Sequence, residues 1–293
     1  MLQLDGINKR FGDRAVLKDV SFTVGPGRLT GFVGGNGAGK TTTMRIVLGV
    51  LNADSGTVTL DGSRLGPADR RRFGYMPEER GLYPKMKVLE QIVYLGRLHG
   101  MAQRDATDSA NALLERLGLA ERLNDTVESL SLGNQQRAQI AAALVHRPEV
   151  LVLDEPFSGL DPMAVETVLS VLQDVAASGS PVLFSSHQLE VVERLCDDLV
   201  VIADGAIRAS GSREKLRADN SRSQWELLTG TDAAWVRDVP GVTVVEFDGG
   251  YAVFEADETV AQTVLRRAIE NGPVASFAPR RPTLTQIFKE VVS

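Results

Sequence analysis

The sequence predicts an α/β protein of two domains: a large domain over residues 1–215 with antiparallel β and helical subdomains, and a small α+β domain over residues 216–293. The large domain is predicted by a glycine-rich turn, residues 34–41, that lies between an apolar strand and a helix. A second sign is an apolar run, residues 150–153, of the kind buried in a parallel sheet. The small domain is predicted by the order of patterns after residue 223, which is βαββαβ and a closing helix. That order is typical of a ferredoxin-like fold.

The first strands are predicted by alternation. Residues 2–8 and 16–24 alternate apolar and polar side chains, which favours two antiparallel strands that end at the turn 25–27. Phe11 stands between them. The residues alone leave open whether its ring packs in the core or is exposed for stacking on a base.

The glycine-rich turn reads Gly34-Gly35-Asn36-Gly37-Ala38-Gly39-Lys40-Thr41, and a helix is expected from Thr42 to Val50. Its spacing, G-x-x-x-x-G-K-[ST], is that of the phosphate-binding loop of P-loop NTPases. The glycines at 34, 37 and 39 are expected to clear space so that backbone N–H groups can approach a phosphate chain. Lys40 is then expected to reach the β- and γ-phosphates, and the Thr41 hydroxyl to bind Mg²⁺.

Helical spacing of apolar residues follows in residues 87–99 and 104–117. The segment that starts at Leu130 opens a further helix, which is expected to reach about His146. Ser131 is a suitable N-cap for it, because its hydroxyl can accept a hydrogen bond from the first turn.

Two carboxylates, Asp154 and Glu155, directly follow the apolar run 150–153. In open α/β sheets ligands bind at the carboxyl ends of the strands, so both side chains are expected at the ligand-facing edge. His187 ends a further apolar strand, residues 182–186. A histidine at that edge, near two carboxylates, is more typical of a functional residue than of a core residue.

Beyond Gly211 the chain is polar and charged as far as Arg222, which is typical of a linker. The strands expected after it cover residues 225–228, 242–247, 251–255 and 274–278, and the helices cover 233–239, 258–271 and 284–292. This region has no histidine, no cysteine and no clustered glycine loop, so no second active site is expected in it. We expect an accessory unit for dimerisation or regulation.

The composition of the chain indicates which kinds of partner to expect. With 32 basic and 38 acidic residues the formal charge is −6, whereas a nucleic-acid surface usually carries a basic excess. No signal-peptide pattern is present, and no apolar run approaches the ~20 residues that cross a bilayer. We therefore expect a soluble protein that binds neither nucleic acid nor lipid directly. The one cysteine, Cys196, lies in an apolar stretch and is expected to be buried and reduced.

Five elements together resemble those of an ABC transporter ATP-binding subunit: the loop 34–41, the segment 130–137, the strand with Asp154 and Glu155, residues 158–161, and His187. They stand in the order and spacing of that family over nearly all of residues 1–215. The resemblance implies ATP and Mg²⁺ as cofactors and ATP hydrolysis by a homodimer. It also implies a cytoplasmic protein held at the inner face of the cell membrane by an integral-membrane permease.

The resemblance also implies roles for individual residues at the ATP site. Phe11 matches the aromatic residue that stacks on adenine, which is usually a tyrosine. Lys40 keeps its phosphate role. Asp154 resembles the acid that supports Mg²⁺, Glu155 the general base that polarises the attacking water, and His187 the histidine that contacts the γ-phosphate.

The resemblance also assigns residues to the opposite subunit's site. Ser131 and Gly133 match the signature motif, which in this family completes the ATP site of the partner, and Asp161 resembles a residue that communicates across the dimer. The motif departs from the usual pattern, because it reads Leu-Ser-Leu-Gly-Asn instead of Leu-Ser-Gly-Gly-Gln.

A second departure is Glu78, which follows a short expected strand, residues 73–77, where the family usually has a glutamine. A carboxylate can still bind a metal ion, but it adds negative charge beside the triphosphate. Thr41, Asp154 and Glu78 are therefore the expected Mg²⁺ ligands.

The runs 77–86 and 282–288 resemble a subgroup that serves ABC-2-type exporters, including sodium and drug efflux ATPases with an extra C-terminal domain. The resemblance implies a separate permease whose short helix docks beside the loop after Glu78. The residues expected to line that groove are Leu82, Tyr83, Met86, Val88 and Tyr94. The alternative is that they pack into the helical subdomain's own core.

An ABC ATPase that acts on nucleic acid is the alternative function. Such proteins carry coiled-coil or zinc-binding insertions between the phosphate loop and the signature motif. Here only about ninety residues separate the two, without heptads and with no pair of cysteines. A ligand-sensing role of the C-terminal domain is compatible with either function.

Overall fold

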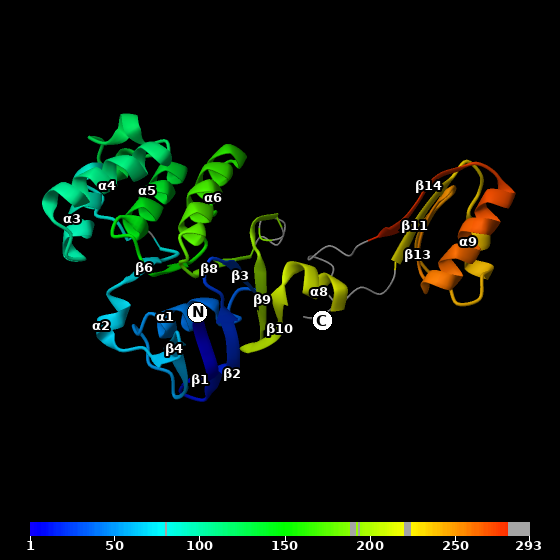
Figure 1. Cartoon of the computed structure of the whole chain (residues 1–293), viewed down its shortest axis with the longest axis horizontal. Coiled ribbons are helices and arrows are strands. Elements are labelled where there is room, and N and C mark those ends of the chain that lie inside the picture. The colour runs from blue at the N-terminus through cyan, green and yellow to red at the C-terminus, as the bar shows by residue number, and fades with distance from the viewer. Residues whose placement is uncertain (80, 188–191, 193, 220–223, 281–293) are drawn as a thin grey trace. The chain divides into compact units, whose positions relative to one another are not determined.

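The structure, a computed structural model, describes residues 1–79, 81–187, 192, 194–219 and 224–280 (Figure 1). It divides into two compact units, one over Met1–Arg213 and a second that begins at Glu214. Each unit has a hydrophobic core of its own. None of the helices in the described residues is both long and apolar enough to span a bilayer.

An antiparallel sheet begins the first unit, with the strand order β2-β1-β4-β5. Its strands are β1 (Leu2–Phe11), β2 (Arg14–Val24), β4 (Ser55–Leu60) and β5 (Ser63–Arg64), and the short helix α2 (Pro67–Arg70) follows them. The predicted antiparallel pairing of the first two strands is confirmed, with Leu2 opposite Val24. The predicted alternation is present as well, because Leu4 and Ile7 are buried while Asp5 is exposed.

A six-stranded sheet lies at the centre of the same unit, in the order β10-β9-β3-β8-β7-β6. Its strands are β3 (Leu29–Val33), β6 (Phe73–Met76), β7 (Val150–Leu153), β8 (Val182–Ser186), β9 (Asp198–Ala203) and β10 (Ala206–Ser212). Pairing is parallel from β9 through β6, and only β10 runs antiparallel to its neighbour. All four residues of β7 are buried, as predicted. Because β8 lies between β3 and β7, the segments that follow these three strands meet at one edge of the sheet.

The helices of the first unit are α1 (Lys40–Val47), α3 (Val88–Leu98), α4 (Gln103–Arg116), α5 (Leu132–Leu144) and α6 (Pro162–Ala177), with 3-10 turns η1 (Ala120–Arg122) and η2 (Val127–Ser129). Helices α3, α4 and α5 pack against one another as a helical subdomain (Figure 1). The predicted helical spacing has its expected consequence on α3, where Val88 and Ile92 are fully buried. A further helix, α8 (Arg213–Asp219), begins where the first unit ends. Cys196 is buried and unpaired with any other cysteine, as predicted.

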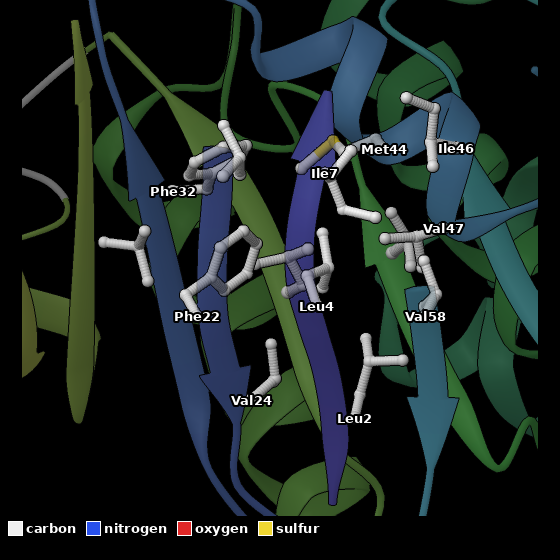
Figure 2. Close-up of a cluster of buried hydrophobic side chains, with 14 of the residues drawn as sticks. Leu2, Leu4, Ile7, Phe22, Val24, Phe32, Met44, Ile46, Val47 and Val58 are labelled. Carbon is white, nitrogen blue, oxygen red and sulfur yellow. The ribbon is translucent and has the colours of Figure 1, made fainter. Parts of the chain in front are cut away.

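The core of the first unit connects the two sheets to helix α1. Figure 2 shows Leu4 and Ile7 of β1 close to Phe22 of β2 and Met44 of α1. The ring of Phe22 lies 5.2 Å from that of Phe32 on β3. Burial of side chains of this size stabilises the fold by roughly 1.5–3 kcal/mol each. This packing fixes α1, and with it the phosphate-binding loop that precedes it, relative to both sheets.

The second unit contains an antiparallel sheet in the order β12-β13-β11-β14. Its elements are β11 (Gln224–Thr229), the 3-10 helix η3 (Ala234–Asp238), β12 (Thr243–Asp248), β13 (Tyr251–Glu255), α9 (Glu258–Asn271) and β14 (Val274–Arg280). This confirms the ferredoxin-like order, with a 3-10 helix in place of the first predicted α-helix. Leu227, Phe254 and Val264 are fully buried in its core. The predicted closing helix lies outside the described residues.

Candidate functional site

A cavity of about 420 Å³ opens at the edge of the central sheet where the phosphate-binding loop and the two carboxylates meet. Its lining consists of Phe11, Arg14, Val16, Gly35, Asn36, Gly37, Gly39, Lys40, Thr41, Thr42, Glu78, Asp154 and Glu155. Segments that are far apart in the sequence thus converge on one hollow, and most of the predicted site residues line it.

The phosphate-binding loop has the expected backbone. Gly39 has φ 113° and directly precedes helix α1, so the first N–H groups of the helix face the loop. Lys40 is 8% exposed, and its Nζ donates to the carbonyl oxygens of Gly34 at 2.7 Å and Gly35 at 3.3 Å. An ammonium group is therefore held directly over the loop that would bind phosphate.

Two of the loop glycines are also needed for packing within the chain. A Cβ on Gly34 would lie 2.4 Å from the Ile202 carbonyl oxygen, and one on Gly39 would lie 2.6 Å from Leu17 Cδ2. Both distances are shorter than van der Waals contact, so these glycines are required by packing against β9 and β2. The prediction that Gly34, Gly37 and Gly39 clear space for backbone N–H groups to approach a phosphate chain stays a prediction. Gly37, at φ 76°, adopts a backbone conformation that other residues rarely adopt.

One hydroxyl group holds the Asp154 carboxylate and the backbone of Glu155. Ser185 Oγ on β8 accepts a hydrogen bond from the Glu155 N–H at 2.9 Å and donates to Asp154 Oδ1. Gln136 Nε2 donates to the Glu155 carbonyl oxygen at 2.9 Å. Glu155 has φ 52°, a strained conformation for this residue type, and such strain is typical of functional positions.

His187 directly follows β8 and reaches the same carboxylate. Its Nδ1 lies 2.9 Å from Glu155 Oε2, within hydrogen-bonding distance. The side chain of His187 is 51% exposed, whereas that of Glu155 is 9% exposed. One imidazole nitrogen therefore contacts Glu155, the candidate general base, while the ring is accessible to solvent.

The residues present fit a magnesium ion. Asp154 Oδ2 is buried and has no hydrogen-bond partner within the described part of the chain. Thr41 and Glu78, which also offer oxygen atoms, line the same cavity. Mg²⁺ prefers oxygen ligands and usually takes one or two carboxylates together with phosphate oxygens. In keeping with that, no group of three or more His, Cys, Asp or Glu side chains suited to a metal occurs among the described residues.

The hydroxyl of Tyr75 on β6 is influenced by the charges of Asp154 and Glu78. Burial, and secondly the negative charge of Asp154, raise the pKa of its hydroxyl above the ordinary tyrosine value, although Arg45 opposes the shift. Tyr75 therefore stays neutral at physiological pH and adds no third negative charge beside Asp154 and Glu78.

The exposure of Phe11 answers the question that the sequence left open. Its side chain is 51% exposed at the cavity, and Lys9 Nζ lies 5.6 Å from the ring centroid. The ring is thus exposed at the cavity and does not belong to the core, and its stacking on a base stays a prediction.

Arg14 and Val16 line the cavity and were not predicted as site residues. Arg14 follows Phe11 after only two residues, and the two residues lie opposite each other across that turn. This short separation is the sequence feature that could have indicated Arg14. Neither residue belongs to a motif of fixed spacing, so the sequence pattern alone does not single them out.

Ser131, Gly133 and Asp161 do not line this cavity. Ser131 caps α5 as predicted, since its Oγ accepts from the Asn134 N–H at 3.4 Å, and Asp161 caps α6 by accepting from the Ala164 N–H at 2.8 Å. Leu132, the first departure in the signature motif, is 57% exposed at the start of α5. Of the remaining predicted residues, Gly34, Ala38 and His187 adjoin the cavity lining in sequence or by contact without being part of it.

A second, shallower cavity of about 650 Å³ lies over the helical subdomain, lined by Tyr83, Pro84, Lys85, Met86, Tyr94 and Glu128. Tyr83 and Tyr94 are 58% and 42% exposed. Val88 is fully buried, so its predicted place in the groove is wrong; it faces the core because it begins α3 on the packed side. Gln91 holds the backbone of this loop, accepting from the Tyr83 N–H at 2.6 Å and donating to the Tyr83 carbonyl oxygen at 3.2 Å.

Comparison with known proteins agrees with this geometry. A family model described as ABC transporter matches residues 17–158, and one described as ATP-binding protein DrrA1-3-like, C-terminal domain, matches residues 211–292. YhaQ of Bacillus subtilis (strain 168), described as an uncharacterized ABC transporter ATP-binding protein, is 36% identical over 293 residues, which is 100% of this chain and 98% of YhaQ. The chain belongs to the ABC transporter ATP-binding proteins.

Further relatives of this ABC ATPase support the same conclusion. The Nod factor export ATP-binding protein I of Burkholderia lata is 39% identical over 236 residues, covering 79% of this chain and 77% of that protein. A solved structure of the ATP-binding subunit of an ABC transporter has a TM-score of 0.70 and 31% identity, over 75% of this chain and 92% of that chain. The predicted P-loop NTPase fold is thus confirmed, and the chain belongs to a family of ATPases that bind ATP.

Proposed function

We propose that the chain is the ATP-hydrolysing subunit of an ABC-2-type export system and energises a permease that is a separate chain. The observation that carries this proposal is the match of residues 211–292 to the DrrA1-3-like C-terminal domain, which follows a cassette whose cavity brings together the phosphate-binding loop, Asp154 and Glu155. The relative from Burkholderia lata, whose name states Nod factor export, supports the same direction of transport.

Hydrolysis transfers the γ-phosphoryl group of ATP to water. The Glu155 carboxylate acts as the general base that orients the water and takes its proton, and His187 holds this carboxylate through the 2.9 Å contact. Lys40 and the loop N–H groups bind the phosphate chain, while the ring of Phe11 stacks on the adenine. Thr41, Asp154 and Glu78 would hold Mg²⁺, which when bound neutralises phosphate charge.

The active form is a homodimer in this proposal. Ser131 and Gly133 lie away from the chain's own cavity, at the exposed start of α5. The N-terminus of that helix carries unpaired N–H groups suited to binding phosphate. In the dimer these groups would complete the ATP site of the second copy. The side chain of Asn134, the second departure in the motif, accepts a hydrogen bond from Arg137 within the same helix.

The permease would dock at the second cavity, where Tyr83, Met86 and Tyr94 offer apolar surface. An amphipathic helix of the partner suits such a groove. The protein would then sit at the cytoplasmic face of the membrane through its partner, without direct contact to lipid or nucleic acid.

The test is co-expression with the membrane protein encoded in the adjacent reading frame. We expect co-purification, ATPase activity stimulated by the permease, and ATP-dependent export in inverted vesicles. An ATPase that fails to bind the membrane protein and is stimulated by DNA instead would favour the nucleic-acid alternative.

A further inference from the structure

Arg14 is a cavity residue that the roles above do not cover. It is the first residue of β2 and pairs directly with Phe11, the last residue of β1, across the turn Gly12-Asp13. Residues directly opposite each other in an antiparallel pair project from the same face of the hairpin. The hairpin therefore presents an aromatic ring and a guanidinium group side by side, and both line the nucleotide cavity.

The guanidinium group of Arg14 lies next to the phosphate-binding loop. A Cβ built on Gly37 would be 4.0 Å from Arg14 Nη2, the nearest atom to that position outside Gly37 and its two chain neighbours in the described part of the chain. Lys40 Nζ lies at the same loop, 2.7 Å from the Gly34 carbonyl oxygen. Two cationic side chains thus lie at the phosphate-binding loop. Lys40 belongs to α1, and Arg14 belongs to the hairpin that carries Phe11.

The charge balance of the cavity indicates what Arg14 is for. The lining has three carboxylates, Glu78, Asp154 and Glu155, against the two cations Lys40 and Arg14. A phosphate chain is itself strongly anionic, so the loss of one cation would leave three carboxylates and the ligand facing Lys40 alone. Within the described residues Arg14 has no ion-pair or hydrogen-bond partner that would occupy its guanidinium group.

We propose that Arg14 is a second phosphate-binding residue of this ATPase, which contacts the polyphosphate chain of ATP while the neighbouring Phe11 stacks on the base. The planar guanidinium fork suits two phosphate oxygens at once, and such charge-assisted hydrogen bonds are stronger than neutral ones. This proposal rests on ATP binding by the family and does not depend on export.

The experiment measures dissociation constants of the full-length chain by calorimetry for Mg·ATP, inorganic tripolyphosphate and adenosine. Arg14→Ala is expected to weaken the binding of ATP and of tripolyphosphate about tenfold, the low end for a hydrogen bond to a charged group, because the site is open to water. Its affinity for adenosine is expected to stay within about twofold of the wild type. Arg14→Lys should keep part of the affinity, because it keeps the positive charge. Arg14→Gln, of similar size but neutral, should bind as weakly as Arg14→Ala.

Arg64→Ala is the matched control, because Arg64 is an exposed arginine on β5 of the same sheet and does not line the cavity. It should leave all three affinities unchanged. The proposal is wrong if Arg14→Ala and Arg14→Gln bind ATP and tripolyphosphate as the wild type does. It is also wrong if adenosine affinity falls as much as ATP affinity, since Arg14 would then only maintain the hairpin that holds Phe11.

Discussion

The imidazole Nδ1 of His187 lies 2.9 Å from Oε2 of Glu155, although the two residues follow different strands of the central sheet. Strands β7 and β8 are parallel neighbours, so the residues that follow them meet at the same edge. Glu155 is further held by Ser185 through its N–H and by Gln136 through its carbonyl oxygen. The backbone of Glu155 is thus fixed by two hydrogen bonds, and its carboxylate is contacted by His187. A carboxylate positioned in this way is prepared to orient a water molecule, which a freely rotating one is not.

The first prediction concerns Glu155 as the base. Glu155→Gln should keep ATP affinity and lower kcat by roughly 10²–10⁴-fold, because the amide cannot accept the proton of the water. It should also accumulate an ATP-bound dimer, detectable by size-exclusion chromatography with light scattering. Glu115→Gln, an exposed substitution on α4, serves as the control. Undiminished turnover in a preparation free of contaminating ATPase would remove Glu155 from this role.

Most of this site could be predicted from the sequence because its residues belong to motifs of fixed spacing. The loop 34–41 and the pair Asp154-Glu155 adjoin buried strands, and parallel strands bring their carboxyl ends together. The ferredoxin-like order of the second unit followed in the same way from alternating patterns.

The features that were missed depend on tertiary contacts. Arg14 enters the cavity because of hairpin pairing with Phe11, and no motif marks it. Val88 is apolar like its neighbours in the predicted groove, but its position on α3 turns it to the core. The reason for Gly34 is its approach to Ile202, a residue far away in the sequence. A local sequence pattern cannot predict such contacts, because they join residues from different elements of the fold.

The second prediction concerns Glu78, which stands where the family usually has glutamine and lines the cavity with Asp154. Glu78→Gln removes one of three carboxylates beside the triphosphate. We expect the Mg²⁺ concentration for half-maximal ATPase activity to rise several-fold, on the order expected for a lost metal ligand, with ATP affinity changed less. Glu79→Gln is the adjacent control. A change confined to ATP affinity would contradict a role in the metal site.

The third prediction is a pH dependence of stability set by His146. Its ring stacks on that of His99 with 3.6 Å between centroids, and its Nε2 lies 3.2 Å from the Phe73 carbonyl oxygen. Burial, and secondly the charge of His99, lower the pKa of His146 from 6.5 to about 4, against the opposing hydrogen bond to Phe73. The unfolded chain therefore binds more protons than the folded one between these values.

This stabilising contribution is complete above the unfolded pKa of about 6.5 and is lost as the pH falls toward the folded value of about 4. The urea midpoint of the wild type should therefore fall between pH 7.5 and pH 5, and His146→Gln should fall less over the same interval. Lys9 and Arg10 lower the pKa of Asp54, and the Gly66 N–H lowers that of Asp69, below the ordinary aspartate value of 3.8, so both groups titrate below that interval. An equal fall in wild type and variant would exclude His146 as the cause.

The fourth prediction concerns the second unit, which has a core of its own and whose sequence contains no histidine and no cysteine. A chain that ends at about residue 215 should keep Lys40-dependent ATP binding, measured by calorimetry, and lose self-association or transport. A folded truncated chain that no longer binds ATP would show instead that the second unit contributes to the nucleotide site.

The last prediction tests the permease groove. Tyr83 and Met86 line the second cavity, and Gln91 fixes the backbone of Tyr83 to α3, so the exposed ring is presented on a rigid support. Charged groups there would have to be desolvated by an apolar partner helix. Tyr83→Asp with Met86→Asp should therefore abolish co-purification with the permease and recruitment to membranes, while ATP binding by the isolated chain stays unchanged. Leu98→Asp is the matched control, since Leu98 is 65% exposed on the same helix as Tyr94 but outside the cavity. Retention of the permease by the double variant, or its loss in the Leu98 control alone, would place the docking surface elsewhere.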